Sequence, residues 1–220
     1  MLNFIIGRNN SGKTEKIRAL IAERASENKK CILIVPEQFS FESERSILEK
    51  IGAQKMLNVD ILSFTRLAFV INEQYGKALN KTIDDGTRKV LMSLSLEALS
   101  GKLEYFKRFS SKPALLSNLL TFVTELKQCA VTPDEIAEIS GKTGNKSLGK
   151  KLSELSLIAA SYDALVSRSF FDDENLLPIA ADMISETDFF DGKAVYFDAF
   201  CGFTEQERNC IKSILPKAEN

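Results

Sequence analysis

The chain has 220 residues, of which 44% are hydrophobic and 27% are charged, and its formal net charge is −1. This length fits one large domain or two small ones, and the apolar fraction is sufficient for a proper core. The near-neutral charge excludes binding to nucleic acid through bulk electrostatics, so any DNA contact must be local. No apolar run approaches the roughly 20 residues of a membrane helix, so no membrane span is expected.

The cysteine and histidine content excludes several kinds of chemistry. The chain has four cysteines without a C-x-x-C pair, and it has no histidine. These counts exclude the usual zinc sites and any Ser-His or Cys-His catalysis. We expect free thiols in a reducing cytoplasm, and an N-terminus that is not a signal peptide. The cysteines are Cys31, Cys129, Cys201 and Cys210.

The N-terminus combines an apolar run, Leu2–Ile6, with a glycine-rich motif and a helical stretch, Lys13–Asn28. The motif G-x-x-x-x-G-K-[ST] is complete in Gly7, Arg8, Asn9, Asn10, Ser11, Gly12, Lys13 and Thr14. In a strand–loop–helix context, backbone N–H groups of such a loop surround a phosphate at the helix N-terminus. Lys13 would reach the outer phosphates of ATP, and the Thr14 hydroxyl would hold Mg²⁺. The two asparagines are compatible with the loop, since Asn tolerates a left-handed backbone.

Two further strand–helix pairs follow the loop. The runs Cys31–Val35 and Asn58–Leu62 predict strands, and Phe39–Ile51 predicts a helix that stops at Gly52. Ser63 is suited to capping a helix that continues to Tyr75. Continuous apolar strands separated by helices favour an α/β fold with a parallel sheet covered on both faces.

Residues 84–186 contain almost no strand signal and predict an all-helical insertion. The helical stretches are Thr87–Leu99, Pro113–Cys129, Pro133–Ile139, Ser147–Ser167 and Glu174–Ile184. The α/β pattern returns in 187–220 with a strand, Ala194–Phe197, and a helix, Thr204–Leu215, that begins with a capping box. Residues 1–83 and 187–220 would thus form one α/β domain. We expect this domain to be incomplete at Asn220, because few sheets end directly after such a helix.

Asp198 ends the last predicted strand, where P-loop enzymes place a carboxylate that holds Mg²⁺. ATPases of the helicase type follow it with a glutamate that activates water, but this chain has Ala199, whose methyl group cannot accept a proton. We therefore assign no catalytic residue. The long separation between Lys13 and Asp198 favours a superfamily 1 helicase arrangement over a small nucleotide kinase. Two alternatives stay open: an active ATPase or phosphotransferase that uses Glu37 or Glu205, and a structural scaffold with a relic loop.

Several blocks together resemble the N-terminal part of the B subunit of the bacterial AddAB (RexAB) helicase–nuclease. Besides the phosphate loop and Leu126-Lys127, the blocks are ILIVPEQFS from Ile32 to Ser40, LSFTRLA from Leu62 to Ala68, and FDAFCGFTEQE from Phe197 to Glu207. The resemblance covers the whole chain. It implies a RecA-like P-loop domain of the superfamily 1 domain 1A type with a 1B-type insertion.

The resemblance also implies a biological role. The B subunit pairs with a helicase–nuclease A subunit, and the heterodimer processes single- and double-stranded DNA ends in recombinational repair of double-strand breaks. The family's B subunit contributes an exonuclease domain with an iron–sulfur cluster, which lies C-terminal to residues 1–220, and takes part in recognising the Chi sequence. Its helicase fold is thought not to be a motor, and Ala199 agrees with that.

Analogy with related helicases places single-stranded DNA against the segments after the second and third strands. Hydroxyl and amide groups there would hold phosphates, Phe64 would pack against or stack on a base, and Arg66 would pair with a phosphate. The remaining candidates are Gln38, Ser40 and Ser63. The alternative is that Ser63 only caps a helix, Phe64 belongs to the core and Arg66 is solvated.

A small basic cluster lies in and after the polar loop of the insertion. We interpret it as a solvated surface rather than a DNA-binding patch. It comprises Lys142, Lys146, Lys150 and Lys151.

Overall fold

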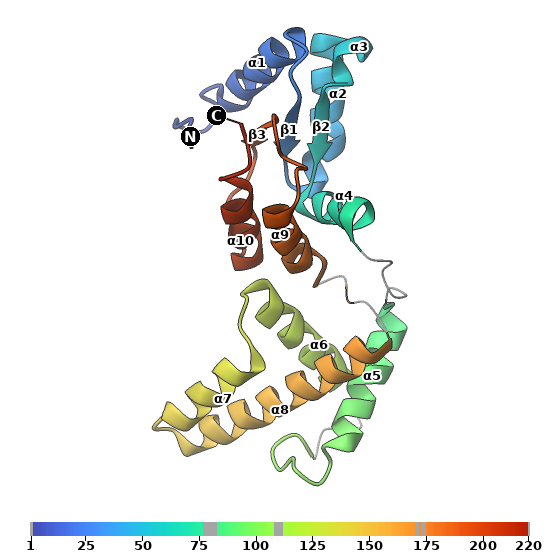
Figure 1. Cartoon of the computed structure of the whole chain (residues 1–220). Helices are drawn as coiled ribbons and strands as arrows, with labels where there is room; N and C mark the ends of the chain where they lie inside the picture. The colour runs from blue at the N-terminus through green and yellow to red at the C-terminus, as the bar shows by residue number, and fades with distance from the viewer. Residues whose placement is uncertain (1, 77–82, 108–111, 170–171, 173–174, 220) are drawn as a thin grey trace. The chain divides into compact units, whose positions relative to one another are not determined.

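A computed structural model describes residues 2–76, 83–107, 112–169, 172 and 175–219. The chain forms two compact units (Figure 1). The α/β unit comprises Met1–Lys77 and Leu176–Asn220, and the helical unit comprises Ala78–Asn175. The helical unit is thus inserted into the α/β unit. It ends at Asn175 rather than at residue 186, because helix α9 (Leu176–Glu186) packs against helices α4 and α10 of the α/β unit.

The α/β unit contains a three-stranded parallel sheet in the order β2-β1-β3. Its elements are α1 (Lys13–Ser26), β1 (Cys31–Ile34), the 3-10 turn η1 (Glu37–Phe39), α2 (Ser40–Ile51), α3 (Ala53–Met56), β2 (Val59–Leu62), α4 (Phe64–Tyr75), α9, β3 (Ala194–Phe197) and α10 (Glu205–Ile214). The central strand, β1, pairs Ile34 with Leu62 on one side and with Phe197 on the other.

Both faces of β1 are buried, as its uninterrupted apolar sequence predicts. Cys31 and Leu33 belong to a cluster with Ile17 and Ile21 of α1 and Ile47 of α2. Ile32 and Ile34 point to the opposite face, because strand side chains alternate, and both are fully buried.

The strand predicted at Leu2–Ile6 is not formed. The side chains of Leu2, Phe4 and Ile6 are 54%, 76% and 91% exposed. Within the described residues, the outer edge of β3 has no partner strand. A strand is stable only with a ladder partner, so an apolar run alone does not make one. The structure therefore has the expected α/β class and parallel sheet, but not the complete RecA-like sheet that the resemblance implies.

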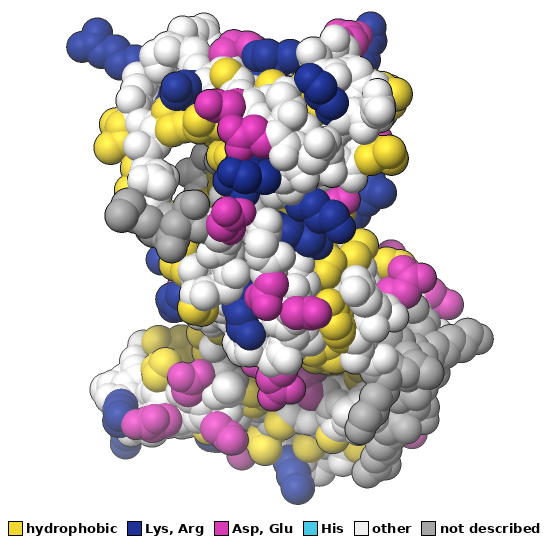
Figure 2. Space-filling view, turned by 45° about the horizontal axis from the view of Figure 1, so that its top comes forward, with side chains coloured by type: hydrophobic (Ala, Val, Ile, Leu, Met, Phe, Trp, Pro, Cys, Tyr) yellow, Lys and Arg dark blue, Asp and Glu magenta, His cyan; other side chains and the backbone are white. Residues whose placement is uncertain are grey.

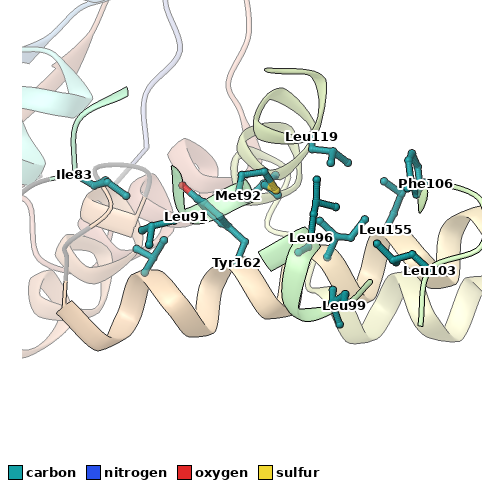
Figure 3. Close-up of a cluster of buried hydrophobic side chains, with 14 residues drawn as sticks. Ile83, Leu91, Met92, Leu96, Leu99, Leu103, Phe106, Leu119, Leu155 and Tyr162 are labelled. Atoms are coloured by element: carbon teal, nitrogen blue, oxygen red, sulfur yellow. The ribbon is translucent and has the colours of Figure 1, made fainter. Parts of the chain in front are cut away.

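The helical unit contains α5 (Asp85–Ala98), α6 (Pro113–Gln128), α7 (Pro133–Lys142) and α8 (Lys146–Ser169). Figure 3 shows its core, in which the Tyr162 ring lies near Leu91 and Met92. Tyr162 is 1% exposed, and burial raises the pKa of its phenol to about 12. Gly149 allows α7 and α8 to approach closely, because a Cβ there would lie 2.9 Å from the carbonyl oxygen of Ser140.

Helix ends follow the local sequence signals. Thr204 and Glu207 form the predicted capping box of α10, and Ser63 caps α4 by accepting a bond from the N–H of Arg66. Pro133 occupies the first turn of α7, whose N-cap is Thr132. In the described part of the chain, no helix is both long and apolar enough to cross a membrane.

Candidate functional site

A pocket of about 500 Å³ lies where the three parallel strands of the α/β unit end. Each strand contributes the segment that follows it. These segments run from Val35 to Phe39 after β1, from Ser63 to Thr65 after β2, and from Ala199 to Gly202 after β3, with Glu207 of α10 completing the wall. Ligands of open α/β sheets bind at the carboxyl ends of the strands, so this pocket is the candidate site.

Three of the five predicted DNA-contacting residues line this pocket. Gln38 is exposed in η1 and leaves its carboxamide available at the surface. Ser63 is 3% exposed, and its hydroxyl accepts the helix-capping bond from Arg66. Phe64 is 5% exposed. The pocket thus offers one accessible amide and an aromatic wall.

The other two predicted residues lie outside the pocket lining. Arg66 is exposed in the first turn of α4, immediately after the lining residue Thr65. Ser40 is 8% exposed at the start of α2, and its hydroxyl lacks a hydrogen-bond partner among the described residues. The guanidinium of Arg66 is therefore accessible to a phosphate, whereas Ser40 is not accessible in this conformation.

Four phenylalanine rings form a cluster beside the pocket. The Phe64 ring centroid lies 6.1, 5.6 and 6.2 Å from those of Phe197, Phe200 and Phe203. Phe200 and Phe203 are 4.8 Å apart. The contacts join the end of β2 to the segment after β3, so Phe64 is part of the packing as well as a wall of the pocket.

The backbone after β3 is unusual at Ala199, where the sequence predicts that a catalytic glutamate is replaced. The Asp198 N–H donates to the carbonyl of Ile34 at 3.1 Å and so continues the ladder with β1. Ala199 then has a φ of 64°, which costs an L-residue about 1–2 kcal/mol. Ala199 is exposed in the pocket lining. Its methyl group supplies no acid, base or hydrogen bond there.

The predicted phosphate loop is closed on itself. Lys13 Nζ donates to the carbonyl oxygens of Gly7 at 3.1 Å and Arg8 at 2.8 Å. Asn10 and Gly12 have φ values of 57° and 82°, so Asn10 does adopt the left-handed backbone that its residue type permits. The loop leads directly into α1, whose N-terminus has no side-chain cap.

The structure does not bring the two predicted Mg²⁺ ligands, Thr14 and Asp198, together. Glu15 in the first turn of α1 lies 3.8 Å from Lys50 in the last turn of α2. Helix α2 starts beyond the carboxyl end of β1, and the chain then passes through α3 to the start of β2. The last turn of α2, and with it the first turn of α1, therefore lies toward the amino ends of the strands (Figure 1). Among the described residues, no hydrogen bond or ion pair joins Thr14 to Asp198.

The two alternative carboxylates also lie apart from the loop. Glu37 is exposed in the pocket lining at the end of β1. Glu205 pairs with Lys212 at 3.4 Å and with Arg208 at 3.8 Å on α10. Neither carboxylate makes a described contact with Lys13.

Charge is distributed locally rather than as one field. Figure 2 shows basic and acidic side chains interspersed on the face in view. In the predicted basic cluster, Lys142 pairs with Glu138, Lys150 pairs with Glu104, and Lys151 lies over the Tyr105 ring. These contacts agree with a solvated surface. Over the ranges that the structure covers, no group of three His, Cys, Asp or Glu residues could hold a metal ion.

All four cysteines are free thiols, as expected. Cys31 and Cys210 are buried, and burial raises the pKa values of their thiols to about 11 and about 12. Cys129 and Cys201 are exposed. The buried pair is therefore unreactive at neutral pH.

Comparison with known proteins decides the family. The family model described as "ADDB, N-terminal" matches residues 4–220. The chain belongs to the AddB N-terminal family. It is 33% identical, over 99% of its length, to the B subunit of the ATP-dependent helicase/deoxyribonuclease of Clostridium tetani. The proteins of the same description from Clostridioides difficile and Clostridium novyi are 31% and 30% identical over 100% and 98% of the chain.

The chain spans 19% of the length of these relatives. Membership of the AddB family therefore covers the two units described here.

Local sequence patterns predict only part of this pocket. Phe197, Phe200 and Phe203 were not predicted to act as a group, although their spacing of three residues is a readable signal. Glu207 was recognised as a capping residue, and its carboxylate does accept the Thr204 N–H at 2.7 Å, but it also lines the pocket. The contact of the three rings with Phe64 depends on the pairing of β1 with both neighbours, which no local pattern reveals.

Proposed function

We propose that this chain is a helicase-like, non-motor module of the B subunit of an ATP-dependent helicase–deoxyribonuclease. It binds single-stranded DNA at the strand-end pocket while an A subunit supplies the motor, and the heterodimer processes double-strand break ends in the cytoplasm. The observation that carries the proposal is the pocket itself, which combines an amide, an aromatic wall and Ala199 at the place of the water-activating glutamate.

The chemistry of the lining residues suits contacts with the bases of DNA rather than with its phosphates. Among the described lining residues there is no lysine or arginine, and the charged members are Glu37 and Glu207. Such a wall suits the edge and face of a base, since carboxylates and amides accept from base amino groups and aromatic rings stack. Arg66, exposed just outside the lining, then pairs with a backbone phosphate.

Arg66→Ala is expected to weaken single-stranded DNA binding about fivefold, because one charge-assisted phosphate contact is lost. It should also reduce the slope of log affinity against log salt by about 0.7. Gln38→Ala should weaken binding by a similar factor without changing the slope. Fluorescence anisotropy with labelled oligo-dC, whose bases carry an amino group, over a salt series measures both quantities.

Arg45→Ala is the matched control for this experiment. Arg45 is a surface arginine of α2 whose partner is Glu49, at 2.9 Å. Affinity and slope should both stay at the wild-type values. An unchanged slope in Arg66→Ala would contradict the assigned phosphate contact.

We further propose that the loop from Gly7 to Thr14 binds ATP with Mg²⁺ as a structural ligand. On binding, Lys13 would exchange its two backbone carbonyl partners for phosphate oxygens, and the free N–H groups at the start of α1 would face the nucleotide. Thr14 would ligate Mg²⁺, and Asp198 would join it only if the first strand enters the sheet. Ala199 leaves no group to activate water.

Lys13→Ala is expected to weaken ATP binding about 30-fold or more, since a cation–phosphate contact is removed. Titration calorimetry on the full-length protein with a catalytically inactivated A subunit measures this, and Lys16→Ala, exposed one turn along α1, is the control. Equal ATP binding in wild type and Lys13→Ala would indicate a relic loop. ATP hydrolysis that Lys13→Ala abolishes would contradict the non-motor assignment.

A further inference from the structure

A buried ion cluster joins distant parts of the helical unit. The Asp172 carboxylate is 3% exposed and accepts from Arg88 Nη2 at 2.5 Å and from Lys127 Nζ at 2.7 Å. Lys127 Nζ also lies 3.0 Å from Asp163 Oδ1. Two cations and two carboxylates thus meet at one point, so their charges balance.

The cluster includes residues from the beginning and the end of the helical unit. Arg88 lies in the first turn of α5, the first helix of the unit, and Lys127 lies in the last turn of α6. Asp172 comes after α8, shortly before Leu176, where the chain returns to the α/β unit. The cluster therefore fastens the end of the helical unit to its beginning.

Three of the four members of the cluster are largely buried, so they depend on one another for compensation of charge. The side chains of Arg88 and Lys127 are 17% and 12% exposed. Removing one member of a buried ion pair leaves the opposite charge without compensation, which costs far more than losing a surface pair. Neutralising Asp172 removes the carboxylate that Arg88 contacts and leaves Lys127 only Asp163, which is 40% exposed. Neutralising Asp163 leaves Lys127 its contact with Asp172.

In the α/β unit, a side-chain hydrogen bond likewise joins the segment before the insertion to the segment after it. Asn72, near the end of α4, is 2% exposed, and its amide donates to the carbonyl of Leu176 at 3.3 Å and to that of Ala68 at 2.8 Å. α4 is the last helix before the chain leaves this unit, and Leu176 is the first residue after it returns. Each unit thus ties its own outgoing and incoming segments together.

We propose that Asp172 is a latch that fastens the C-terminal end of the helical unit to the start of α5 and the end of α6. When it is closed, Asp172 binds Arg88 of α5 and Lys127 of α6 and so joins the end of the helical unit to its first two helices. When it is open, the first turn of α5 and the last turn of α6 fray, while the core around Tyr162 stays folded. With the latch closed, the inserted helices unfold as one cooperative unit.

Hydrogen exchange with mass spectrometry on the full chain tests the latch. Asp172→Asn should raise amide exchange about tenfold in peptides covering the first turns of α5 and the last turns of α6. Exchange in the middle of α8 and throughout the α/β unit should change less than about twofold. Asp163→Asn should raise exchange at the same places by a smaller factor, and Asp182→Asn, exposed on α9, should change nothing.

Three results would overturn the latch: unchanged exchange in α5 and α6, an increase spread evenly over the helical unit, or an equal effect of Asp182→Asn. If Asp172→Asn does not fold, Arg88→Lys decides the matter. It retains the charge but loses the planar guanidinium. It should therefore raise exchange moderately, and only in the peptides covering the first turns of α5 and the last turns of α6. Wild-type exchange in Arg88→Lys would equally overturn the proposal.

Discussion

Glu154→Ala is expected to lower the free energy of unfolding of the helical unit by about 3 kcal/mol. The Glu154 carboxylate on α8 is 6% exposed and accepts from the backbone N–H groups of Glu104 at 2.8 Å, Tyr105 at 2.8 Å and Phe106 at 3.1 Å. These donors belong to the segment after α5. Removing the acceptor leaves one buried and two partly buried N–H groups without this partner, and each buried group costs about 1–3 kcal/mol, not additively.

This contact also predicts a pH dependence. Burial pushes the pKa of Glu154 up, but the three N–H donors and Lys150 outweigh burial and hold the pKa below its ordinary value of 4.5. Since the folded pKa is depressed, the stabilisation is fully present above about pH 4.5 and is lost as the pH falls through the folded pKa. Glu154→Gln should lack this part of the acid sensitivity.

Urea denaturation at pH 7 and at successively lower pH measures both effects. Glu97→Ala is the matched control, because Glu97 is an exposed helical glutamate of the same unit. It should change stability by less than about 0.5 kcal/mol. Equal stability losses in the two alanine variants at pH 7 would show that the carboxylate does not hold this segment.

Phe64→Ala is expected to cost the α/β unit about 3–5 kcal/mol, the usual loss for a buried phenylalanine. Its ring is 5% exposed and contacts Phe197, Phe200 and Phe203, so its removal opens a cavity between β2 and the segment after β3. Hydrogen exchange of peptides in β2 and β3 should report the loss, which thermal denaturation followed by circular dichroism then quantifies.

Phe69→Ala provides the control on the same helix. Phe69 is 55% exposed, so its truncation should cost less than about 1 kcal/mol. A cost for Phe64→Ala no greater than that for Phe69→Ala would contradict the packing role. Phe64→Leu keeps most of the buried volume, so a loss of oligo-dC binding in a folded Phe64→Leu would separate stacking from packing.

Local signals predicted most elements of both units. The apolar run Cys31–Val35 and the capping residues Ser63 and Thr204 indicated a strand and two helix starts that the structure contains. These signals work because capping and strand burial depend on residues a few positions apart. The same is true of Asn10, whose residue type permits the backbone that it adopts.

Other features depended on contacts between distant residues. Leu2–Ile6 has a strand-like sequence, yet without a ladder partner it remains exposed. α9 has an ordinary amphipathic sequence, and only its packing against α4 and α10 assigns it to the α/β unit. The Asp172 cluster draws residues from four separate segments, so no spacing rule indicates it.

The sequence by itself determined the family through several motif blocks, and it determined the α/β class and the helical insertion through local periodicity. Only the tertiary structure decided which residues share the strand-end pocket and that Phe64 is packed among other rings. The physical reason is that a parallel sheet gathers its carboxyl ends through long-range pairing. A motif whose own strand is unpaired, such as the loop from Gly7 to Thr14, is left out of that arrangement.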